Sequence, residues 1–431
     1  MAQFRTDTHE YDNTGTVRFE TVMLADQYGE LVGAANPSGM AVDAFGRARV
    51  ATPVTLFDSF HRYQDNGKVS TYISGGGTST YDINSSSILM NVGTASGDEV
   101  IRETNRVFAY QPGKSLQILI TFCFNEAKDN LRNRAGYFDA QNGIFLQRSG
   151  STVSVVRRSY VTGSVVDTVV NQANWNMDKL DGSGPSKITL DLTKTQIFFM
   201  DIEWLGVGTV RCGFVIDGKL IHVHSFHHAN ATLTAPYMTT AMLPGRVEIS
   251  NLAEVASAST QRQICFSVIS EGGYELSGRP KTIEIPVGSP RNLSTAGTYY
   301  PVLSLRLKSD RLNSIVLPKN FSLLGIGNNT RMAWKLINNT TLTGANWVSA
   351  GADSYVEYDM SATALSGGTS LASGYTAITN QAVNPVTLDS GLFKYQLERN
   401  PFTATAHVFT LAIATANNGD DVLASMDWQE I

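Results

Sequence analysis

Four of the seven histidines stand close together in the sequence, at His222, His224, His227 and His228. If His222 and His224 lie on a strand, their spacing of two residues puts both imidazoles on the same face of the sheet. Two imidazoles presented in this way can bind a transition-metal ion. A polar sheet face or a contact between subunits would use the same residues without a metal.

The register of a predicted hairpin favours a polar sheet face or a subunit contact over a metal site. Asp217-Gly218 lies between two apolar runs and predicts a two-residue type I′ turn, which needs positive φ at both positions. Pairing outward from this turn matches Phe214 with Ile221, Cys212 with Val223, Gly213 with His222, and Arg211 with His224. An arginine beside His224 opposes a divalent cation, so we predict no metal ligands and no cofactor.

A second candidate for chemistry is the pair Asp201 and Glu203, again two residues apart. On one strand face they would resemble the alternating acidic residues of retaining glycosidases with a sandwich fold. The position two residues before Asp201 is Phe199, however, so the leading carboxylate of that pattern is missing. Because glycoside hydrolysis needs both an acid and a nucleophile or base, we predict no catalytic residues and no enzyme activity.

Five aromatic residues remain as candidates for stacking against a sugar: Trp175, Trp204, Trp334, Trp347 and Tyr355. Large rings more simply fill the core of a β-sandwich or an interface. The glycines Gly75–Gly77 precede no predicted helix, so they do not predict a phosphate cradle.

The composition predicts a β-rich component of an assembly. Charged residues make up only 16% of the 431 positions, against about 25% in average soluble proteins. Gly, with 37 residues, and many Ser, Thr and Asn take their place, which suits short strands joined by tight turns. The net charge of −5 and the lack of any Lys/Arg cluster beyond Arg157-Arg158 predict no nucleic-acid partner.

The cysteines and the hydropathy pattern point to assembly inside a host cell. Cys123, Cys212 and Cys265 each lie in an apolar run, where a free thiol acts as a small hydrophobic side chain. We therefore expect free thiols and assembly in a reducing cytoplasm. No apolar run reaches the ~20 residues that cross a bilayer, so we expect no membrane insertion.

Alternating apolar positions predict an all-β fold with three regions. Residues 1–100 are turn-rich, with a flexible stretch at Ser74–Ser87, and we expect an extended N-terminal anchoring region there. Residues 101–275 carry about eight strand signals and predict a jelly-roll or lectin-like β-sandwich. Residues 278–431 show the same pattern of short strand signals and predict a second, C-terminal β-sandwich.

Several stretches of the sequence resemble a family of poorly characterised virion structural proteins of tailed bacteriophages, common among marine and cyanobacterial phages. The segments that carry the resemblance are Ala41–Val50, Pro53–Ser59, Gly136–Asp139, Asn142–Phe145, Asn174–Asp178, Leu180–Ser186, Ile202–Gly208, Arg211 and Phe214–Gly218. They span about Ala41 to Tyr274, and none of them is a catalytic signature. Beyond Gly278 we find no resemblance.

The resemblance implies a structural component of a tailed-phage virion, such as a tail, fibre or capsid-exterior (decoration) protein. Its partners would be other virion proteins and copies of itself, for which we expect a homotrimer because rotational symmetry is common in such particles. Two alternatives stay open. The chain could be a receptor-recognition module that binds a host surface glycan, or an enzyme that degrades polysaccharide through Asp201 and Glu203.

Overall fold

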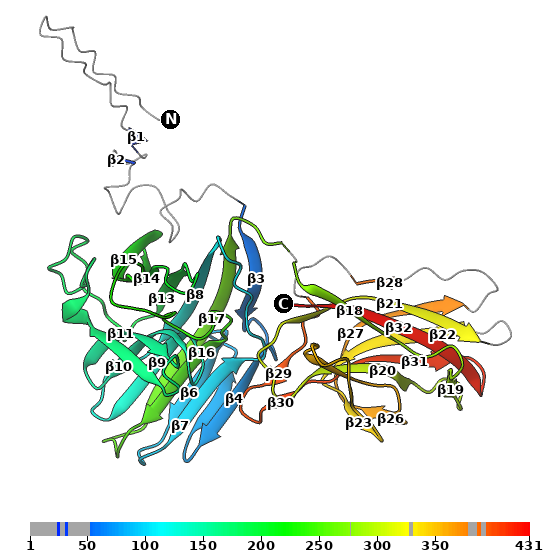
Figure 1. Cartoon of the computed structure of the whole chain (residues 1–431). Coiled ribbons are helices and arrows are strands. Elements are labelled where there is room, and N and C mark those ends of the chain that lie inside the picture. Colours follow the sequence, from blue (N-terminus) through cyan, green and yellow to red (C-terminus); the bar gives the residue numbers. More distant parts are fainter. Residues whose placement is uncertain are drawn as a thin grey trace, which may run out of the picture.

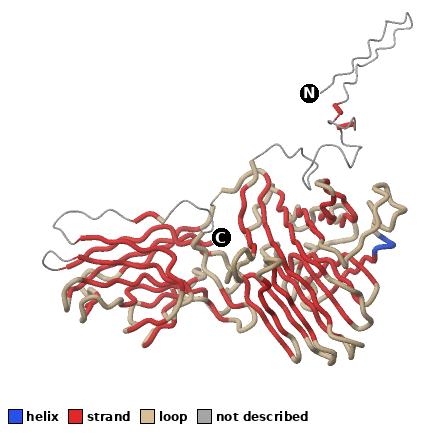
Figure 2. Tube along the Cα trace, turned by 180° about the vertical axis from the view of Figure 1, so that it is seen from behind, coloured by secondary structure: helices blue, strands red, loops and turns tan. Residues whose placement is uncertain are grey.

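The computed structural model describes residues 52–275, 277–326, 331–377, 386–388 and 394–431, together with the short strands β1 (Leu24–Ala25) and β2 (Leu31–Val32). The rest of the predicted N-terminal anchoring region up to residue 51 lies outside the described residues. The described chain is almost entirely strand and loop, with one 3-10 turn at Gln172–Asn174, and it folds into two β-sandwiches (Figures 1 and 2). The predicted all-β fold is confirmed.

The first sandwich consists of two antiparallel sheets. The seven-stranded sheet has the order β12 (Val166–Asn171), β11 (Thr152–Ser159), β10 (Gly143–Ser149), β9 (Leu131–Phe138), β16 (Gly245–Asn251), β7 (Glu99–Thr104) and β4 (Val69–Ser74). The eight-stranded sheet has the order β15 (Lys219–Phe226), β14 (Val210–Ile216), β13 (Gln196–Ile202), β8 (Ser115–Cys123), β17 (Ser259–Glu271), β6 (Ser87–Val92) and β5 (Thr78–Asp82), with β3 (Val54–Phe60) also paired to β17.

Strict alternation of side chains builds the core between these sheets. On β8, Leu116, Ile118, Ile120 and Phe122 all point into one hydrophobic cluster shared by both sheets. Successive side chains of a strand point to opposite faces, so every second residue of β8 is buried in the same layer. This period-two pattern is what the sequence predicted for this strand.

The boundary predicted between residues 100 and 101 does not separate two structural regions. β7 runs across it, and β3 to β6 belong to the two sheets of the first sandwich. The stretch Ser74–Ser87, predicted to be flexible, forms β5 and the turns on either side of it. Gly76 donates its backbone N–H to the carboxylate of Asp98 over 2.7 Å, which fixes the glycine-rich turn to the sheet.

The predicted hairpin β14–β15 is present, with one error in its register. Asp217 and Gly218 have φ of 51° and 74°, as a type I′ turn requires. The pairs nearest the turn are as predicted, but a β-bulge between Cys212 and Gly213 shifts the rest by one residue. Cys212 therefore pairs with His224, and Arg211 pairs with Ser225 rather than with His224.

The second sandwich has a five-stranded and a six-stranded antiparallel sheet. The five-stranded sheet contains β18 (Arg279–Glu284), β32 (Asp420–Glu430), β21 (Val316–Ile326) and β28 (Val386–Thr387), with β19 (Arg291–Leu293) also paired to β32. The six-stranded sheet has the order β24 (Val348–Ser349), β25 (Val356–Asp359), β20 (Tyr300–Leu307), β31 (Phe409–Thr415), β22 (Arg331–Asn338) and β27 (Thr369–Ala377). Two short hairpins, β23 (Thr341–Thr343) with β26 (Ala364–Ser366) and β29 (Arg399–Asn400) with β30 (Thr405–Ala406), complete it.

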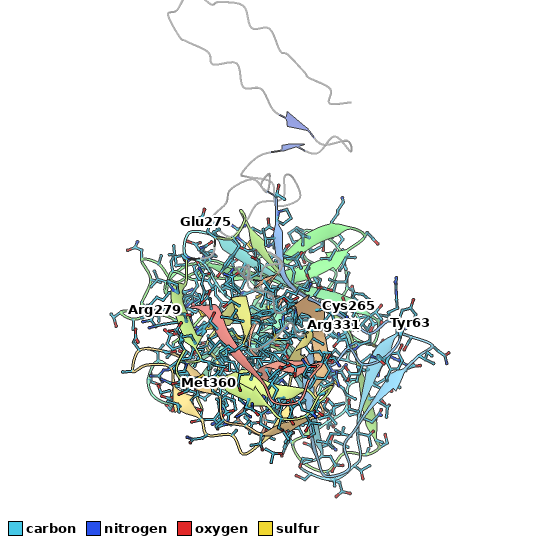
Figure 3. All side chains as sticks on the ribbon, turned by 90° about the vertical axis from the view of Figure 1, so that its right-hand side faces the viewer. Tyr63, Cys265, Glu275, Arg279, Arg331 and Met360 are labelled. Atoms are coloured by element: carbon cyan, nitrogen blue, oxygen red, sulfur yellow. The ribbon has the colours of Figure 1, made fainter. Side chains whose placement is uncertain are left out.

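The two sandwiches lie side by side, and the β29–β30 hairpin lies where they meet (Figure 1). Figure 3 views the molecule from the side of the second sandwich, with Arg279 and Met360 of the second sandwich and Tyr63 of the first labelled. Ile315 and Leu317 of the second sandwich pack into the hydrophobic cluster of the first. β21 thus touches both cores, with Leu317 in the hydrophobic cluster of the first sandwich and Val316 in that of the second.

Candidate functional site

The outer face of the seven-stranded sheet carries an unusual row of side chains. The register places Glu103, Arg246, Gly136, Phe145, Val156 and Val169 opposite one another on consecutive strands. The neighbouring row includes Glu248 and Arg134. Charged, aromatic and aliphatic residues therefore share a face that points away from the main core.

Two phenylalanine rings on this face are fully buried, although no third sheet in the described part of the chain covers them. Phe138 and Phe145 pack at a tilt of 34° with ring centroids 4.4 Å apart, and together with Val156 they form a small separate cluster. Opposite them stand Gly143 and Gly136, where an added Cβ would lie about 2 Å from the phenylalanine Cβ atoms. Glycine is required at these two positions because the backbone is approached so closely.

Three arginines cover the rings, and we call them the arginine layer: Arg134, Arg158 and Arg246. The guanidinium carbons of Arg134 and Arg158 lie 5.1 and 5.3 Å from the ring centroid of Phe145, and that of Arg246 lies 5.6 Å from Phe138. A guanidinium at this distance is attracted to the face of the ring. The layer thus takes the place of a covering sheet.

Each arginine of the layer is also held by a carboxylate. Arg158 binds Asp167 through two bonds of 2.9 Å, and Arg134 contacts Glu248 at 3.3 Å. Burial alone would raise the pKa of Glu248, but the charges of Arg246 and Arg134 outweigh burial and lower it. Burial lowers the pKa of Arg134 to about 10, so its guanidinium stays charged at neutral pH.

The series of contacts between arginines and carboxylates continues into the second sandwich. Arg246 donates to Glu248 over 2.6 Å and to Glu103 over 2.7 Å. The other oxygen of Glu103 accepts a 2.8 Å bond from Arg399 on β29. We call Arg399, Glu103 and Arg246 the interdomain clamp. Burial raises the pKa of Glu103 above its usual value and outweighs the two arginines, which share this one carboxylate and lower that pKa.

Further bonds surround the clamp. Arg399 also donates to the backbone oxygen of Thr104 over 3.0 Å and to Asn313 over 2.6 Å. Nearby, Arg106 of the first sandwich binds Glu398 of the second at 2.7 Å. Burial would raise the pKa of Glu398, but its hydrogen bond with His407 and the charge of Arg106 lower that pKa to about 2. The junction is therefore held by the buried Arg399–Glu103 contact, by the partly buried Arg106–Glu398 contact and by the packing of Ile315 and Leu317 against the first core.

A cleft of about 270 Å³ opens beside the clamp. The β9–β10 turn of the first sandwich forms one wall, and residues around Leu312 and Pro401 of the second sandwich form the other. Glu103, Arg246 and Arg399 lie in its lining. The sequence did not point to this cleft, because its two walls come from segments far apart in the chain.

The structure does not place Asp201 and Glu203 together on one strand face. Asp201 lies on β13, is fully buried and accepts a 3.1 Å bond from Ser115. β13 ends at Ile202, and Glu203 begins the turn to β14, where its backbone pairs with Thr209. The predicted geometry of this pair is therefore wrong, because the strand stops one residue before Glu203.

The four clustered histidines have different contacts. Burial lowers the pKa of both His224 and His228, and His227, which bonds to Thr209 over 3.5 Å, lies near enough to lower it further. The His222 ring lies edge-on to Phe199, and His224 accepts a 3.4 Å bond from the backbone N–H of Asn176. His228 bonds to the Gly208 carbonyl over 2.6 Å and stacks on Tyr237 with centroids 3.9 Å apart. Within the described part of the chain, no group of three or more His, Cys, Asp and Glu residues is arranged to hold a metal ion.

The aromatic residues that the sequence suggested for sugar stacking lie in or against the cores, or beneath cations. Trp175 is buried in the first core, and Trp204 and Trp334 pack against the two cores. The charged ends of Arg306 and Arg279 lie 4.2 and 5.2 Å from the ring centroids of Trp347 and Tyr355. The exposed aromatic residues are others, with Tyr375 89% and Tyr63 79% exposed.

All three cysteines are free thiols, as predicted. The Arg157-Arg158 pair is divided between the two faces of β11, with Arg157 bonded to Thr168 and Arg158 to Asp167. Among the described residues there is no helix long and apolar enough to span a bilayer.

No protein-family model matches the sequence, and no curated protein matches it. Solved structures do match the fold at low similarity. A protein of unknown function from Shewanella oneidensis MR-1 has 9% identity and a TM-score of 0.33, and the match covers 53% of this chain and 92% of that one. The Bacillus licheniformis β-glucanase has 11% identity and a TM-score of 0.31, covering 50% and 97%. The CBM2 module of the evolved Dit protein of Lactobacillus casei BL23 phage J-1 has 6% identity and a TM-score of 0.33, covering 52% and 98%.

Proposed function

We propose that this chain is a structural subunit of a tailed-phage virion, acting through contacts with other virion proteins and with copies of itself. The observation that carries the proposal is the interdomain clamp. The buried charges of Arg399, Glu103 and Arg246 join the two sandwiches. Two domains held in one arrangement suit a building unit of a particle. The resemblance of segments between Ala41 and Tyr274 to virion structural proteins supports the same function.

The direct test is quantitative mass spectrometry of purified particles from the virus that encodes the chain. We expect the chain at a fixed copy number per particle. Its absence from particles that are otherwise complete would overturn the proposal. Light scattering of the purified full chain tests the accompanying expectation of a homotrimer, which a monomer or dimer would contradict.

A second candidate function is recognition of a host surface glycan. The observation that favours it is an exposed aromatic patch on the second sandwich. Tyr375 is 89% exposed on β27, and on the adjacent strand Lys335 lies 4.2 Å from the ring centroid of Tyr299. Exposed rings can stack on the apolar faces of sugars.

A glycan array probed with the full chain tests this function. Binding that is lost in Tyr375→Ala would support it. The array signal of Tyr63→Ala, which alters an exposed ring on the other sandwich, should equal that of the unaltered chain. Silence across host polysaccharides would count against glycan recognition at this patch.

A further inference from the structure

The cleft beside the interdomain clamp is built from both sandwiches and is lined by polar and apolar groups in about equal measure. Six side chains supply its hydrogen-bonding capacity: Glu103, Asp139, Gln141, Arg246, Asn313 and Arg399. Leu312 and Pro401 add apolar surface on the side of the second sandwich. The β9–β10 turn that carries Gln141 is exposed, so the cleft can be reached from solvent.

The polar groups of the cleft are held in place before any ligand arrives. Asp139 accepts bonds of 2.7 Å from the backbone N–H groups of Gln141 and Asn142, which fixes the turn. Asn313 uses its carbonyl oxygen to accept from Arg399 over 2.6 Å, so its NH₂ group is the part that can donate to a ligand. Such preorganisation lowers the entropic cost of binding.

The charges of the cleft select the kind of ligand. Arg246 and Arg399 bring two positive charges, and the carboxylates that face them are Glu103 and Asp139 in the lining and Glu248, which also binds Arg246, so neither sign of charge dominates the cleft. An anion would meet the carboxylates of Glu103 and Asp139, and a cation would meet two guanidinium groups. A neutral molecule that offers many hydroxyl groups can bond to both kinds of group without burying an unpaired charge.

We propose that this cleft binds one neutral sugar ring of a glycan. The ring hydroxyls would bond to the Gln141 side chain and to the NH₂ group of Asn313, and the C–H face of the ring would pack on Leu312 and Pro401. A cleft of about 270 Å³ is at the small end of ligand sites, which suits one ring rather than a longer stretch of glycan. The site is separate from the Tyr375 patch and does not depend on the chain being a virion subunit.

Isothermal titration of the full chain with neutral methyl glycosides of glucose, galactose and mannose, and with N-acetylglucosamine, tests the proposal. Glucuronate and glucosamine serve as the charged counterparts. We expect at least one neutral sugar to bind and the charged sugars to bind more weakly. Gln141→Ala removes one bonding group at an exposed position and should weaken binding about tenfold.

Two matched substitutions locate the site. Ala140 is exposed in the cleft wall, so Ala140→Phe should block the cleft and abolish binding while the thermal unfolding midpoint is retained. Ala231→Phe places the same ring at an exposed position elsewhere on the first sandwich and should leave binding unchanged. The proposal is overturned if none of the neutral sugars binds, or if Ala140→Phe binds like the unaltered chain. Binding lost only in Tyr375→Ala would also overturn it and would assign the sugar to the other patch.

Discussion

Replacing Arg399 by methionine should uncouple the two sandwiches. The side chains of Arg399 and Glu103 are only 4% and 3% exposed, so their bond is made away from water. Methionine keeps much of the length and apolar contact of the arginine stem but removes the charge and all of its donors. The substitution therefore isolates the electrostatic part of the clamp.

The expected loss of stability in Arg399→Met depends on the carboxylate of Glu103, which stays buried after its partner is removed. Losing one partner of a buried ion pair typically costs about 3–5 kcal/mol, because the remaining charge stays buried. Glu103 keeps its 2.7 Å bond to Arg246, so we expect the lower end, about 3 kcal/mol. The bond to the backbone oxygen of Thr104, which also joins the two sandwiches, is lost as well, together with the bond to Asn313 within the second sandwich.

Urea unfolding of the full chain, followed by tryptophan fluorescence and by limited proteolysis, measures the coupling. We expect the first unfolding transition of Arg399→Met to move to lower urea and the chain between the sandwiches to be cut sooner. Arg311→Met is the control, because Arg311 and its partner Asp310 are 53% and 66% exposed and an exposed pair contributes little. A loss below about 1 kcal/mol in Arg399→Met would refute the clamp as the element that joins the sandwiches.

Three further predictions concern the first sandwich. Phe145→Ala should lower the free energy of unfolding by about 3–5 kcal/mol, because the ring fills a closed cluster under the arginine layer. A loss under about 1 kcal/mol would contradict this and show that the arginine layer fills the cavity left by the ring. Gly213→Ala should destabilise the chain in the same unfolding assay, because its Cβ would lie 2.1 Å from the Ile221 carbonyl oxygen and 2.6 Å from the Phe199 ring, and an unchanged midpoint would contradict this packing. Burial lowers the pKa of His61, His224 and His228 from 6.5 to about 4, so the unfolded chain binds more protons than the folded chain between these values. The stability present above pH 6.5 should therefore fall as the pH drops toward 4, by up to about 1.4 kcal/mol per pH unit for each histidine. A constant unfolding midpoint across this pH range would contradict the prediction and show that these rings are hydrated.

Local patterns in the sequence predicted the strands whose inner faces are purely apolar. β8 alternates without interruption, and the Asp217-Gly218 turn has the positive φ values that its residues allow. The bulge in the same hairpin was missed because its cause is not local. The carbonyl of Val223 accepts bonds from Met177 and Asp178, a segment about forty residues away that no pairing rule within the hairpin includes.

β9 escaped prediction for a different reason. Its residues Arg132, Asn133 and Arg134 make the strand appear polar on both faces. Asn133 is nevertheless buried and bonds to Gln261 over 2.7 Å, and Arg134 lies over Phe145. Polar residues in these positions can be assigned to a strand only when their partners on other strands are known.

The interdomain clamp also lies beyond the reach of local patterns. Glu103 and Arg399 are 296 positions apart, and neither is remarkable among its sequence neighbours. Their pairing depends on how the second sandwich docks, which follows from the packing of Ile315 and Leu317 rather than from any motif. The cleft and its proposed ligand could therefore be found only from the folded chain.

A cryo-EM map of the phage particles that the proposed function implies would test that proposal most directly. Our account predicts density for both sandwiches at symmetry-related positions, with the same relative orientation in every copy and with Arg399 density reaching Glu103. Particles whose density leaves no place for the two sandwiches, or in which the second sandwich takes different orientations from copy to copy, would contradict a clamped structural subunit.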